Sequence, residues 1–554
     1  MSHTIVEKPV DLYVPKSRQL IQLAESIPYI VKSGVLALRR PYGAKVITSG
    51  IARWGFSLAF LLENAAEHSP NRTAIIDDLG EISYRVLRIR ARRFAAGLAN
   101  LGVVEGDKVG IIARNSRVTP IALAALAYLG VSPMIMNPMS SPAQLDRIIR
   151  SYGAKALIVD AAYVGQLRDL GLPIIIGYHD DKDPAPADLS TMEQIIDAAP
   201  LNPIVAEKPT RMPTVIMSSG TTGLPKGIVR GVPKTPQVLA SILPKIPWRL
   251  HGVIQQHASL FHAWGWLNLN LVWATKSTMI VHRYFDGKQA TDDFLNYEVT
   301  GIISAAIFLK DFEEEYGLRD IDSQTHLRKA KQLRFIASSG NAIPPVLVHA
   351  LNRRFGNVVC NFYGSTEHGP IATASANELA ADPDRAGTIA RGIRVKIFRE
   401  DGTEAATNEV GMVYSCNSES MVGYLSPTDE ATVKDHMLGT GDLGFIDDQG
   451  FLHVRSRYDD MVIKGGENVY PRELEEFLHT LDDIHDAYVR GIRGEIMSEL
   501  NAYVVRAQGS TIDEDSLRKI VADNLAQHNI PDNIIWLDKL PRNDAGKVIP
   551  RELL

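Results

Sequence analysis

At 554 residues the chain exceeds the usual size of one domain, so we expect at least two domains. Its 59 basic and 64 acidic residues nearly balance, and the net charge of -5 excludes a general nucleic-acid binder. Cys360 and Cys416 are too few for a disulfide framework or a cysteine-based zinc site. The N-terminus carries Glu7 and Asp11 where a secretory signal needs a basic start and an apolar core. No run approaches the roughly 18 apolar residues of a membrane span, so we expect a cytoplasmic protein.

Residues 20–60 form an apolar segment with interspersed positive charges. Glu25 is the only acidic residue in this segment. Trp54 is of a type that suits membrane interfaces. One interpretation is therefore an interfacial helix, which would give the protein a peripheral membrane contact. The other is a set of helices that pack on the main body or on a second subunit, the latter implying a homodimer.

Helical periodicity alternates with short β-branched runs through the middle of the chain. Residues 84–101 and 119–129 have the period of helices. The β-branched runs predict strands at residues 109–112, 156–159, 278–281, 301–305, 333–337 and 358–362. This alternation indicates βαβ units with parallel sheet. Beyond residue 388 the pattern becomes β-rich, as at residues 395–398, and beyond residue 457 it is a compact α+β pattern of about 100 residues, an ordinary domain size.

A loop dense in glycines and hydroxyls follows the strand-like residues 214–216. Glycines allow backbone N–H groups to turn toward an anion, hydroxyls add donors and a lysine adds charge. The loop predicts a phosphate cradle made of Ser218, Ser219, Gly220, Thr221, Thr222, Gly223 and Lys226. It is not the common G-x-x-x-x-G-K-[ST] nucleotide loop, because Pro225 and Gly227 flank its lysine. A flexible surface loop is the alternative interpretation.

Further motifs follow in a fixed order. They are Tyr363-Gly364-Ser365-Thr366-Glu367, Thr440-Gly441-Asp442, Ser456-Arg457-Tyr458-Asp459-Asp460, Lys464-Gly465-Gly466-Glu467-Asn468 and the terminal Gly546-Lys547. Together with the loop, this set resembles the signature of the adenylate-forming (ANL) superfamily, in its acyl-CoA synthetase branch. The resemblance extends from about residue 60 to the end. Two positions depart from it: the segment at Gly387 lacks the family's proline, and Ser456 replaces a glycine.

The patterns and the resemblance together predict an α/β fold in three parts. Residues 1–59 would be an N-terminal apolar and basic extension. Residues 60–456 would be a large domain of βαβ-type sheets plus a β-rich subdomain, carrying the ATP and acyl sites. Residues 457–554 would be a small mobile α+β domain with its hinge at Asp459.

The resemblance implies a reaction in two halves, in which a carboxylate first attacks ATP and the thiol of coenzyme A then displaces AMP. Both halves develop negative charge, which calls for fixed dipoles and a cation. Thr366 would donate to the α-phosphate and Glu367 would bind Mg²⁺. Tyr363, Gly364 and Asn361 would hold the adenine. The ribose would be held by Asp442 and Arg457.

Lys547 lies in a polar loop near the chain end, and the resemblance makes it the catalytic lysine of adenylation. Lys464, Gly465 and Gly466 would line the coenzyme A channel after the small domain turns at Asp459. A lysine in such a loop is otherwise an ordinary solvated side chain, and glycine pairs are ordinary turns.

The acid pocket is expected between two apolar segments, one at residues 259–266 and the other at residues 338–344. His262 would sit beside the substrate carboxylate, with Trp264, Trp266, Gly340 and Asn341 around it. The absence of charge in these walls favours a hydrophobic acid, and we expect a medium- or long-chain fatty acid. An aromatic acid is the alternative, since two tryptophans can form a flat slot. A carrier-protein acceptor in place of coenzyme A, and a non-catalytic nucleotide-binding protein, are further alternatives.

Overall fold

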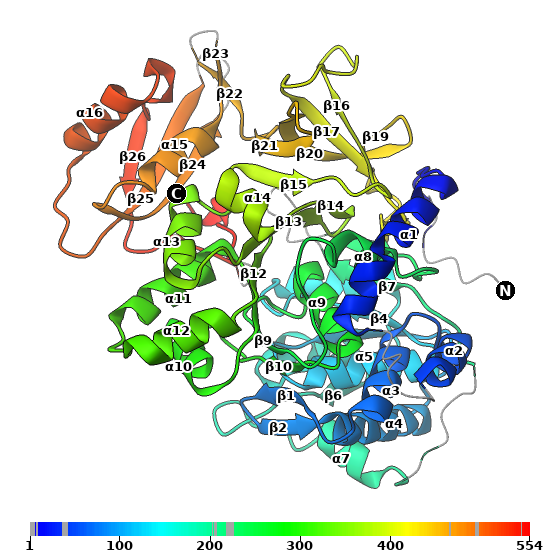
Figure 1. Cartoon of the computed structure of the whole chain (residues 1–554). Helices are drawn as coiled ribbons and strands as arrows, with labels where there is room; N and C mark the ends of the chain where they lie inside the picture. Colours follow the sequence, from blue (N-terminus) through cyan, green and yellow to red (C-terminus); the bar gives the residue numbers. More distant parts are fainter. Residues whose placement is uncertain are drawn as a thin grey trace.

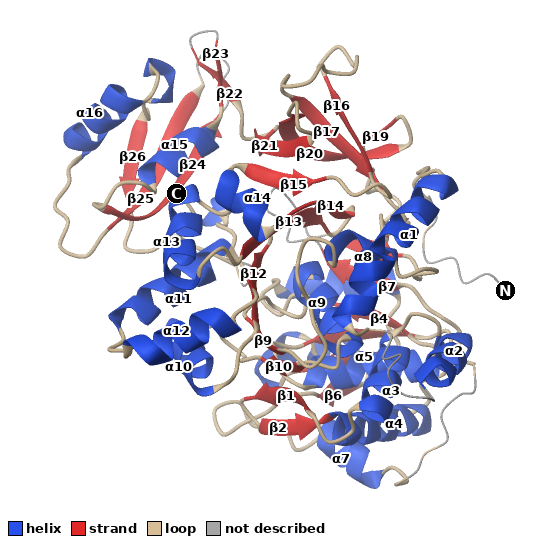
Figure 2. Cartoon of the chain, in the orientation of Figure 1, coloured by secondary structure: helices blue, strands red, loops and turns tan. Residues whose placement is uncertain are grey.

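The computed structural model describes residues 6, 9–35, 43–201, 203, 208–217, 226–464, 467–492, 498–543 and 546–553. Its layers are two large β-sheets with helices packed between and around them, and a smaller domain at the C-terminal end (Figures 1 and 2).

The largest sheet of the described chain has 14 strands, in the order β16-β17-β20-β21-β15-β14-β13-β12-β11-β9-β10-β1-β2, with β19 on β20. Its centre is parallel, because β9 to β13 pair in one direction, and it becomes antiparallel from β14 onward. The strands are β1 (Thr73–Asp77), β2 (Gly80–Ser83), β9 (Val253–Gln256), β10 (Thr278–Ile280), β11 (Gly301–Ser304), β12 (Phe335–Ser338), β13 (Val359–Ser365), β14 (Gly369–Ala374), β15 (Arg385–Thr388), β16 (Arg394–Phe398), β17 (Gly411–Cys416), β19 (Val433–Lys434), β20 (Met437–Ile446) and β21 (Phe451–Arg457).

The second sheet has seven strands among the described residues, in the order β18-β8-β7-β4-β3-β5-β6. Strands β3 to β7 run parallel, as expected for buried βαβ units, and β8 turns back antiparallel to β7. The strands are β3 (Lys108–Ile112), β4 (Ser132–Ile135), β5 (Ala156–Val159), β6 (Ile174–Ile176), β7 (Thr214–Met217), β8 (Gly227–Arg230) and β18 (Gly423–Tyr424).

Helices cover both sheets. Those of the first 250 residues are α1 (Lys16–Ser33), α2 (Gly43–Trp54), α3 (Leu58–His68), α4 (Tyr84–Asn100), α5 (Val118–Leu129), α6 (Pro142–Tyr152), α7 (Met192–Ala198) and α8 (Gln237–Ile242). Those that follow in the large domain are α9 (Ala263–Ala274), α10 (Gly287–Asn296), α11 (Ala306–Leu318), α12 (Ser323–Gln332), α13 (Pro345–Phe355) and α14 (Ala376–Ala381).

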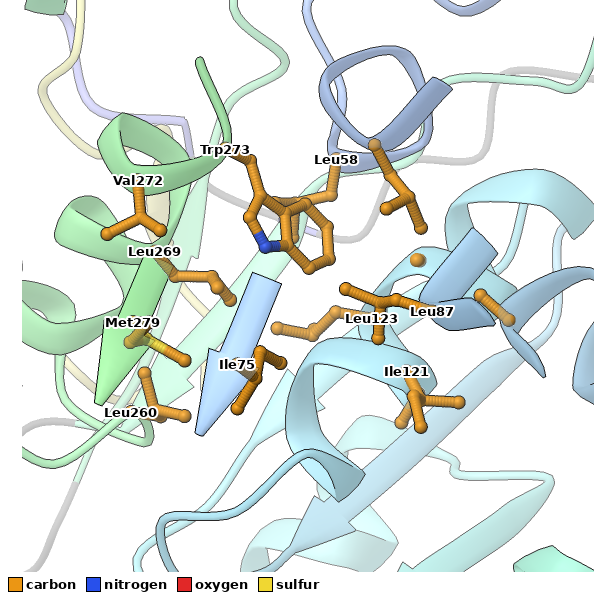
Figure 3. Close-up of a cluster of buried hydrophobic side chains, with 14 of the residues drawn as sticks. Leu58, Ile75, Leu87, Ile121, Leu123, Leu260, Leu269, Val272, Trp273 and Met279 are labelled. Atoms are coloured by element: carbon orange, nitrogen blue, oxygen red, sulfur yellow. The ribbon is translucent and has the colours of Figure 1, made fainter. Parts of the chain in front are cut away.

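The main core lies where α3, α4, α5 and α9 meet the two sheets. Figure 3 shows Leu58 of α3, Leu123 of α5 and Trp273 of α9 turned toward one another. Helix α5 is apolar on nearly all sides because it is buried on nearly all sides. Each fully buried large apolar side chain of this kind stabilises the fold by roughly 1.5–3 kcal/mol.

The small domain follows the turn after Arg457. It contains a hairpin, a three-stranded sheet with an antiparallel and a parallel pair, and two helices. These elements are β22 (Val462–Lys464), β23 (Glu467–Val469), β24 (Ile484–Ile492), β25 (Glu499–Arg506), β26 (Asn533–Trp536), α15 (Pro471–Leu478) and α16 (Glu514–Asn524).

The predicted α/β class is confirmed, and the predicted elements agree closely with α4, α5, β3, β5 and β10 to β13. The β-rich part forms the antiparallel end of the large sheet, which it joins where β21 pairs with β15. For the N-terminal segment, the structure shows packing on the main body: Ile30, Ile47 and Trp54 belong to the main core. No described helix is both long and apolar enough to cross a bilayer. The membrane and homodimer alternatives stay predictions.

Candidate active site

A cavity of about 1470 Å³ lies between the large and small domains. Most of the site residues expected from the sequence that fall within the described part of the chain line it. They are Lys226, His262, Trp264, Trp266, Gly340, Asn341, Asn361, Tyr363, Gly364, Thr366, Glu367, Asp442, Arg457, Asp459 and Lys547. Residues more than 300 positions apart in the sequence are thus brought to one place.

Asp442 is the centre of a polar group formed by three strands of the large sheet. It stands opposite Arg457 in the β20–β21 register, and its Oδ1 accepts from the Arg457 guanidinium at 3.0 Å. The hydroxyl of Tyr363, on β13, donates to its other oxygen. Burial alone would lower the pKa of Arg457, but the Asp442 carboxylate outweighs it and the pKa is raised. A fixed carboxylate beside a flat ring is suited to hold a sugar and a base.

Thr366 and Glu367 follow β13 in the turn to β14. The side-chain hydroxyl of Ser365 donates to Glu367 Oε2 at 2.9 Å, and the carbonyl of Thr366 accepts from Arg230 at 2.8 Å. Arg230 is buried at the end of β8, and its charge faces Glu367 and Glu419. It is a site residue that sequence reasoning missed, since a single arginine after a strand carries no motif.

The Lys547 loop reaches into the cavity from the small domain. Its backbone is closed by hydrogen bonds between Asn543 and Lys547 in both directions, at 2.8 and 2.9 Å. Gly546 has φ +77°, and a Cβ there would lie 2.5 Å from Ile307 on the facing large domain, so glycine permits this close approach. Burial lowers the pKa of Lys547, while the charges of Asp442 and Glu367 raise it in part.

His262 precedes the first residue of α9 and stands on the acid side of the cavity. Its Nε2 is buried and has no hydrogen-bond partner among the described residues, and burial together with the nearby Lys547 lowers the pKa of His262 to about 3. A neutral imidazole with an unsatisfied nitrogen can contact a polar group of a bound molecule. The structure therefore agrees with a contact role and gives no support to acid–base work near neutral pH.

Trp264 and Trp266 differ in how they are held. The Trp264 indole donates to the carbonyl of Ser304 at 3.1 Å and stacks on Phe362, with ring centroids 4.9 Å apart and planes 25° apart. The buried indole nitrogen of Trp266 has no hydrogen-bond partner within the part of the chain that the structure describes. Gly340 and Asn341 face them across the cavity after β12, and Gly340 has φ +99°.

The other expected site residues either fall outside the described part of the chain or do not line the cavity, and Lys226 stands at the edge of the part that is not described. Ser218, Ser219, Gly220, Thr221, Thr222, Gly223, Gly465 and Gly466 lie outside the described residues. Lys226 is described: its ammonium lies 4.7 Å from the Tyr424 ring centre and 4.0 Å from Asp429. Lys464 does not line the cavity, because it pairs with Asp532 at 2.9 Å inside the small domain. It is therefore not near the nucleotide residues in this arrangement.

The segment around Gly387 departs from the family pattern but keeps a strict glycine requirement. Gly387 has φ +134°, and a Cβ there would lie 2.2 Å from the backbone of Thr373 on the neighbouring strand. The carbonyl of the preceding residue, Ala386, accepts from the Asn361 amide at 3.2 Å. The segment that lacks the proline thus still pairs with Thr373 and contacts Asn361 at the cavity.

The sequence is similar to two family models and to several ligases of known name. The AMP-binding enzyme family model matches residues 62–425, and the model of the AMP-binding enzyme C-terminal domain matches residues 473–547. The 4-coumarate–CoA ligase 3 of Oryza sativa subsp. japonica is 27% identical over 87% of this chain and 89% of its own length. The 2-succinylbenzoate–CoA ligase of Geobacillus kaustophilus is 28% identical over 89% of this chain and 96% of its own length.

Solved structures show the same fold. A benzoate CoA ligase from Burkholderia xenovorans LB400 superposes with a TM-score of 0.77 at 24% identity, covering 90% of this chain and 99% of its own. The o-succinylbenzoate CoA synthetase of Bacillus subtilis, solved with an acyl-adenylate, has a TM-score of 0.75 at 25% identity and covers 89% of this chain and 97% of its own. Because the family model alone covers well over half of the sequence, the chain belongs to the AMP-binding enzyme family, the adenylate-forming superfamily, as an enzyme of the AMP-forming acid–CoA ligase type.

Proposed function

We propose that this protein uses ATP and Mg²⁺ to convert a hydrophobic carboxylic acid into its acyl-adenylate and then transfers the acyl group to coenzyme A. The observation that carries the proposal is the position of Lys547, whose charge faces His262 on the acid side and both Glu367 and Asp442 on the nucleotide side. A cation between these groups can stabilise the charge that develops when a carboxylate attacks the α-phosphate.

The nucleotide roles follow from the same geometry. Tyr363, Gly364 and Asn361 would hold the adenine, while Asp442 would accept from the ribose hydroxyls beside Arg457. Thr366 would donate to the α-phosphate. The β- and γ-phosphates would be held by Lys226 and the hydroxyl-rich loop made of Ser218, Ser219, Gly220, Thr221, Thr222 and Gly223. Lys226, at the end of that loop, lines the cavity.

Glu367 fits a Mg²⁺ ion that is shared with the nucleotide. No group of three or more acidic, histidine or cysteine side chains in the described chain could form an all-protein metal cage. Mg²⁺ is commonly bound by one or two carboxylates together with phosphate oxygens, and Glu367 can supply such a carboxylate. When bound, the ion would neutralise phosphate charge and orient the leaving pyrophosphate.

Two further assignments concern the second half-reaction. We place the domain boundary between residues 60–456 and 457–554, and the hinge at Asp459, which lies in the turn directly after β21. A rotation there would withdraw Lys547 and bring Lys464, Gly465 and Gly466 toward the cavity, where they would line a channel for coenzyme A. Lys464 and its partner Asp532 both belong to the small domain, so their ion pair would move with that domain as a unit.

For the acid, an aromatic or ring-bearing substrate has more support than the fatty acid expected from the sequence. The 4-coumarate, 2-succinylbenzoate and benzoate ligases among the similar proteins are named for aromatic acids. Another relative of 28% identity, from Mycobacterium tuberculosis, is named for a propanoyl chain on a fused ring system. The ring of Trp264, fixed by Phe362 and Ser304, offers a flat wall to a substrate ring.

A fatty acid is the second candidate, because the cavity continues beyond Trp266 along α9 to Asn270 and Ala274. The acceptor also has an alternative: a relative of 27% identity from Streptomyces coeruleorubidus is named a fatty acid–[acyl-carrier-protein] ligase. Both alternatives retain every nucleotide residue named above.

Release of pyrophosphate and AMP from Mg²⁺-ATP, with and without coenzyme A, tests the proposal. The acids compared are benzoate, 4-coumarate and saturated fatty acids of increasing length. We expect turnover that requires coenzyme A and favours ring-bearing acids. Coenzyme A-dependent turnover confined to fatty acids would favour the second candidate, pyrophosphate without thioester would favour a carrier protein, and no turnover at all would contradict the proposal.

A further inference from the structure

The cavity extends past the two tryptophans into a second apolar region that no family motif covers. Six side chains line this distal region: Phe56, Leu61, Val238, Leu239, Leu267 and Leu271. Five of them are only partly buried, which leaves surface turned toward the space between them. The region is therefore continuous with the site that holds His262 and Lys547.

These residues come from helices α3, α8 and α9 and from the bend before α3 that contains Phe56. Val238 and Leu239 lie on α8, and Leu267 and Leu271 lie on α9, both within the region matched by the family model. Phe56 and Leu61 precede residue 62, where the match begins. One wall of the distal region is thus supplied by residues that lie just before the segment matched by the family model.

The N-terminal segment, defined here as residues 9–61, is held against α8 by buried hydrogen bonds. The Gln22 amide on α1 donates to Ser241 at 2.9 Å and its oxygen accepts from Gln237. Gln237 also donates to the carbonyl of Gln19 at 3.1 Å. Breaking such a bond would leave a buried polar group unpaired, which makes the position of α1 on α8 specific. Figure 1 shows α1 lying along α8.

A second attachment joins this segment to the end of α9. Lys276 is fully buried, and its ammonium donates to the carbonyl of Val35 at 2.8 Å and to that of Ala274 at 3.1 Å. Ala274 itself lines the cavity. The buried lysine therefore couples the N-terminal segment to the wall of the site.

Helix α3 packs on the main core and thereby holds the two lining residues Phe56 and Leu61 in position. The side chain of Leu58, the first residue of α3, packs beside Trp273 of α9 in the main core (Figure 3). Phe56 lies two residues before Leu58 and Leu61 lies three residues after it, with Phe56 edge-on to Phe60 at 6.5 Å. Because α3 and α9 pack on one core, Phe56 and Leu61 have little freedom to move away from the cavity.

We propose that Phe56 and Leu61 form the distal wall of the acid pocket and set the largest acid that the enzyme accepts. This inference rests on the proposed function, since it assigns the specificity of the same site. An acid whose carboxylate lies at His262 and Lys547 would extend past Trp266, and its far end would meet these two side chains. Removing apolar volume there admits a longer acid, because a close-packed wall otherwise excludes the added groups.

The experiment compares wild type with the variants Phe56→Ala and Leu61→Ala in the full-length protein. The probes are hexanoate, decanoate, hexadecanoate, phenylacetate and 5-phenylpentanoate. Two quantities are measured: kcat/KM for thioester formation, and acid binding from the shift in melting temperature without ATP. We expect both variants to raise kcat/KM for the longest acids relative to the shortest by on the order of tenfold. Leu61→Phe should shift the same ratio in the opposite direction.

Ile51→Ala is the matched control, because Ile51 on α2 packs against the same core but does not line the cavity. An unchanged length preference in the lining variants, or an equal shift in Ile51→Ala, would overturn the inference. If Phe56→Ala does not fold, Phe56→Leu makes the same test with less lost volume. If wild type ligates none of these acids and neither benzoate nor 4-coumarate, the proposed function fails, and the binding profile alone then decides whether Phe56 and Leu61 limit acid length.

Discussion

Arg542 donates from Nη1 to the carbonyl of Gly546 at 2.8 Å, and its Nη2 donates to both carboxylate oxygens of Asp486 at 2.8 and 2.9 Å. Asp486 is buried, so the guanidinium has one orientation in which it satisfies both partners. Gly546 is the residue before Lys547. The pair therefore supports the loop that carries the lysine through the Gly546 carbonyl.

Arg542→Ala should lower kcat for pyrophosphate release by roughly tenfold while changing KM for ATP little, because the loop that places Lys547 loses its support. Arg542→Lys should not restore full activity, since an ammonium cannot satisfy Asp486 and the Gly546 carbonyl with the same fork. Steady-state kinetics measure both constants. A rise in KM alone would contradict the positioning role.

Lys547→Ala should reduce formation of the acyl-adenylate by on the order of 10²-fold, which is the usual cost of one lost preorganised donor. Thioester formation from preformed acyl-adenylate should survive. Lys539→Ala is the control, because Lys539 is an exposed lysine of the same domain. Normal adenylation by Lys547→Ala would falsify the assignment.

Glu367→Gln should raise the Mg²⁺ concentration needed for half-maximal pyrophosphate release by about tenfold or more, because an amide binds a hard cation less well than a carboxylate. A Mg²⁺ titration at fixed ATP measures the effect. Glu409→Gln, which removes a surface carboxylate paired with Arg399, should leave the titration unchanged. Identical Mg²⁺ titration curves for wild type and Glu367→Gln would contradict the assignment of Glu367 as a Mg²⁺ ligand.

Asp459→Pro should slow thioester formation more than adenylation. Proline fixes φ, which hinders rotation in the turn after β21 but leaves the arrangement with Lys547 in place. The two half-reactions are measured separately, as pyrophosphate release without coenzyme A and as thioester from preformed acyl-adenylate. Equal losses in both steps would argue against a hinge at this residue.

Stability should fall as pH rises from about 6.5 to about 10, in part because of His282. Burial would lower its pKa, but hydrogen bonds to Asp293 and Asp78 outweigh burial and raise it to about 10. A raised pKa means that the folded state holds the proton more tightly, so the stabilisation is complete below the unfolded pKa of about 6.5 and is lost as pH passes the folded value.

His282→Gln should therefore reduce this pH dependence and cost on the order of 2 kcal/mol at pH 6, the scale of hydrogen bonds to a charged group. Urea unfolding at several pH values measures it. The control His436→Gln removes an exposed histidine that pairs with Asp11 and should have little effect. If the difference in unfolding free energy between wild type and His282→Gln did not change with pH, the raised pKa of His282 would not be the cause of the pH dependence.

The parts of the site that could be predicted from sequence are those where the chemistry is contained in a few neighbouring residues. Tyr363, Thr366 and Glu367 lie within five consecutive residues at a strand end, and the resemblance of this run to a family motif is what predicts a nucleotide site there. Arg230 could not be predicted, because it is one of 59 basic residues and the carbonyl that it binds is 136 positions away.

The N-terminal segment shows the same limit at the level of the fold. Its apolar character is plain in the sequence but does not say which surface it covers. Its packing on the main body depends on contacts such as that of Gln19 with Gln237, which is 218 positions away and carries no local signal, while the membrane and second-subunit alternatives stay predictions. The fold class, by contrast, follows from the local periods of its strands and helices, and these act over only a few residues.

The β20–β21 ladder has a consequence for the direction of the reaction. Arg457 is the last residue of β21 and stays paired with Asp442 on the large domain, whereas Lys547 belongs to the part that would turn at Asp459. A rotation would thus move Lys547 out of the cavity, while Asp442 and Arg457 would continue to bind the ribose. The adenylate would remain bound but lose the group that eases its return to ATP, so the same movement that admits the thiol would also suppress the reverse step.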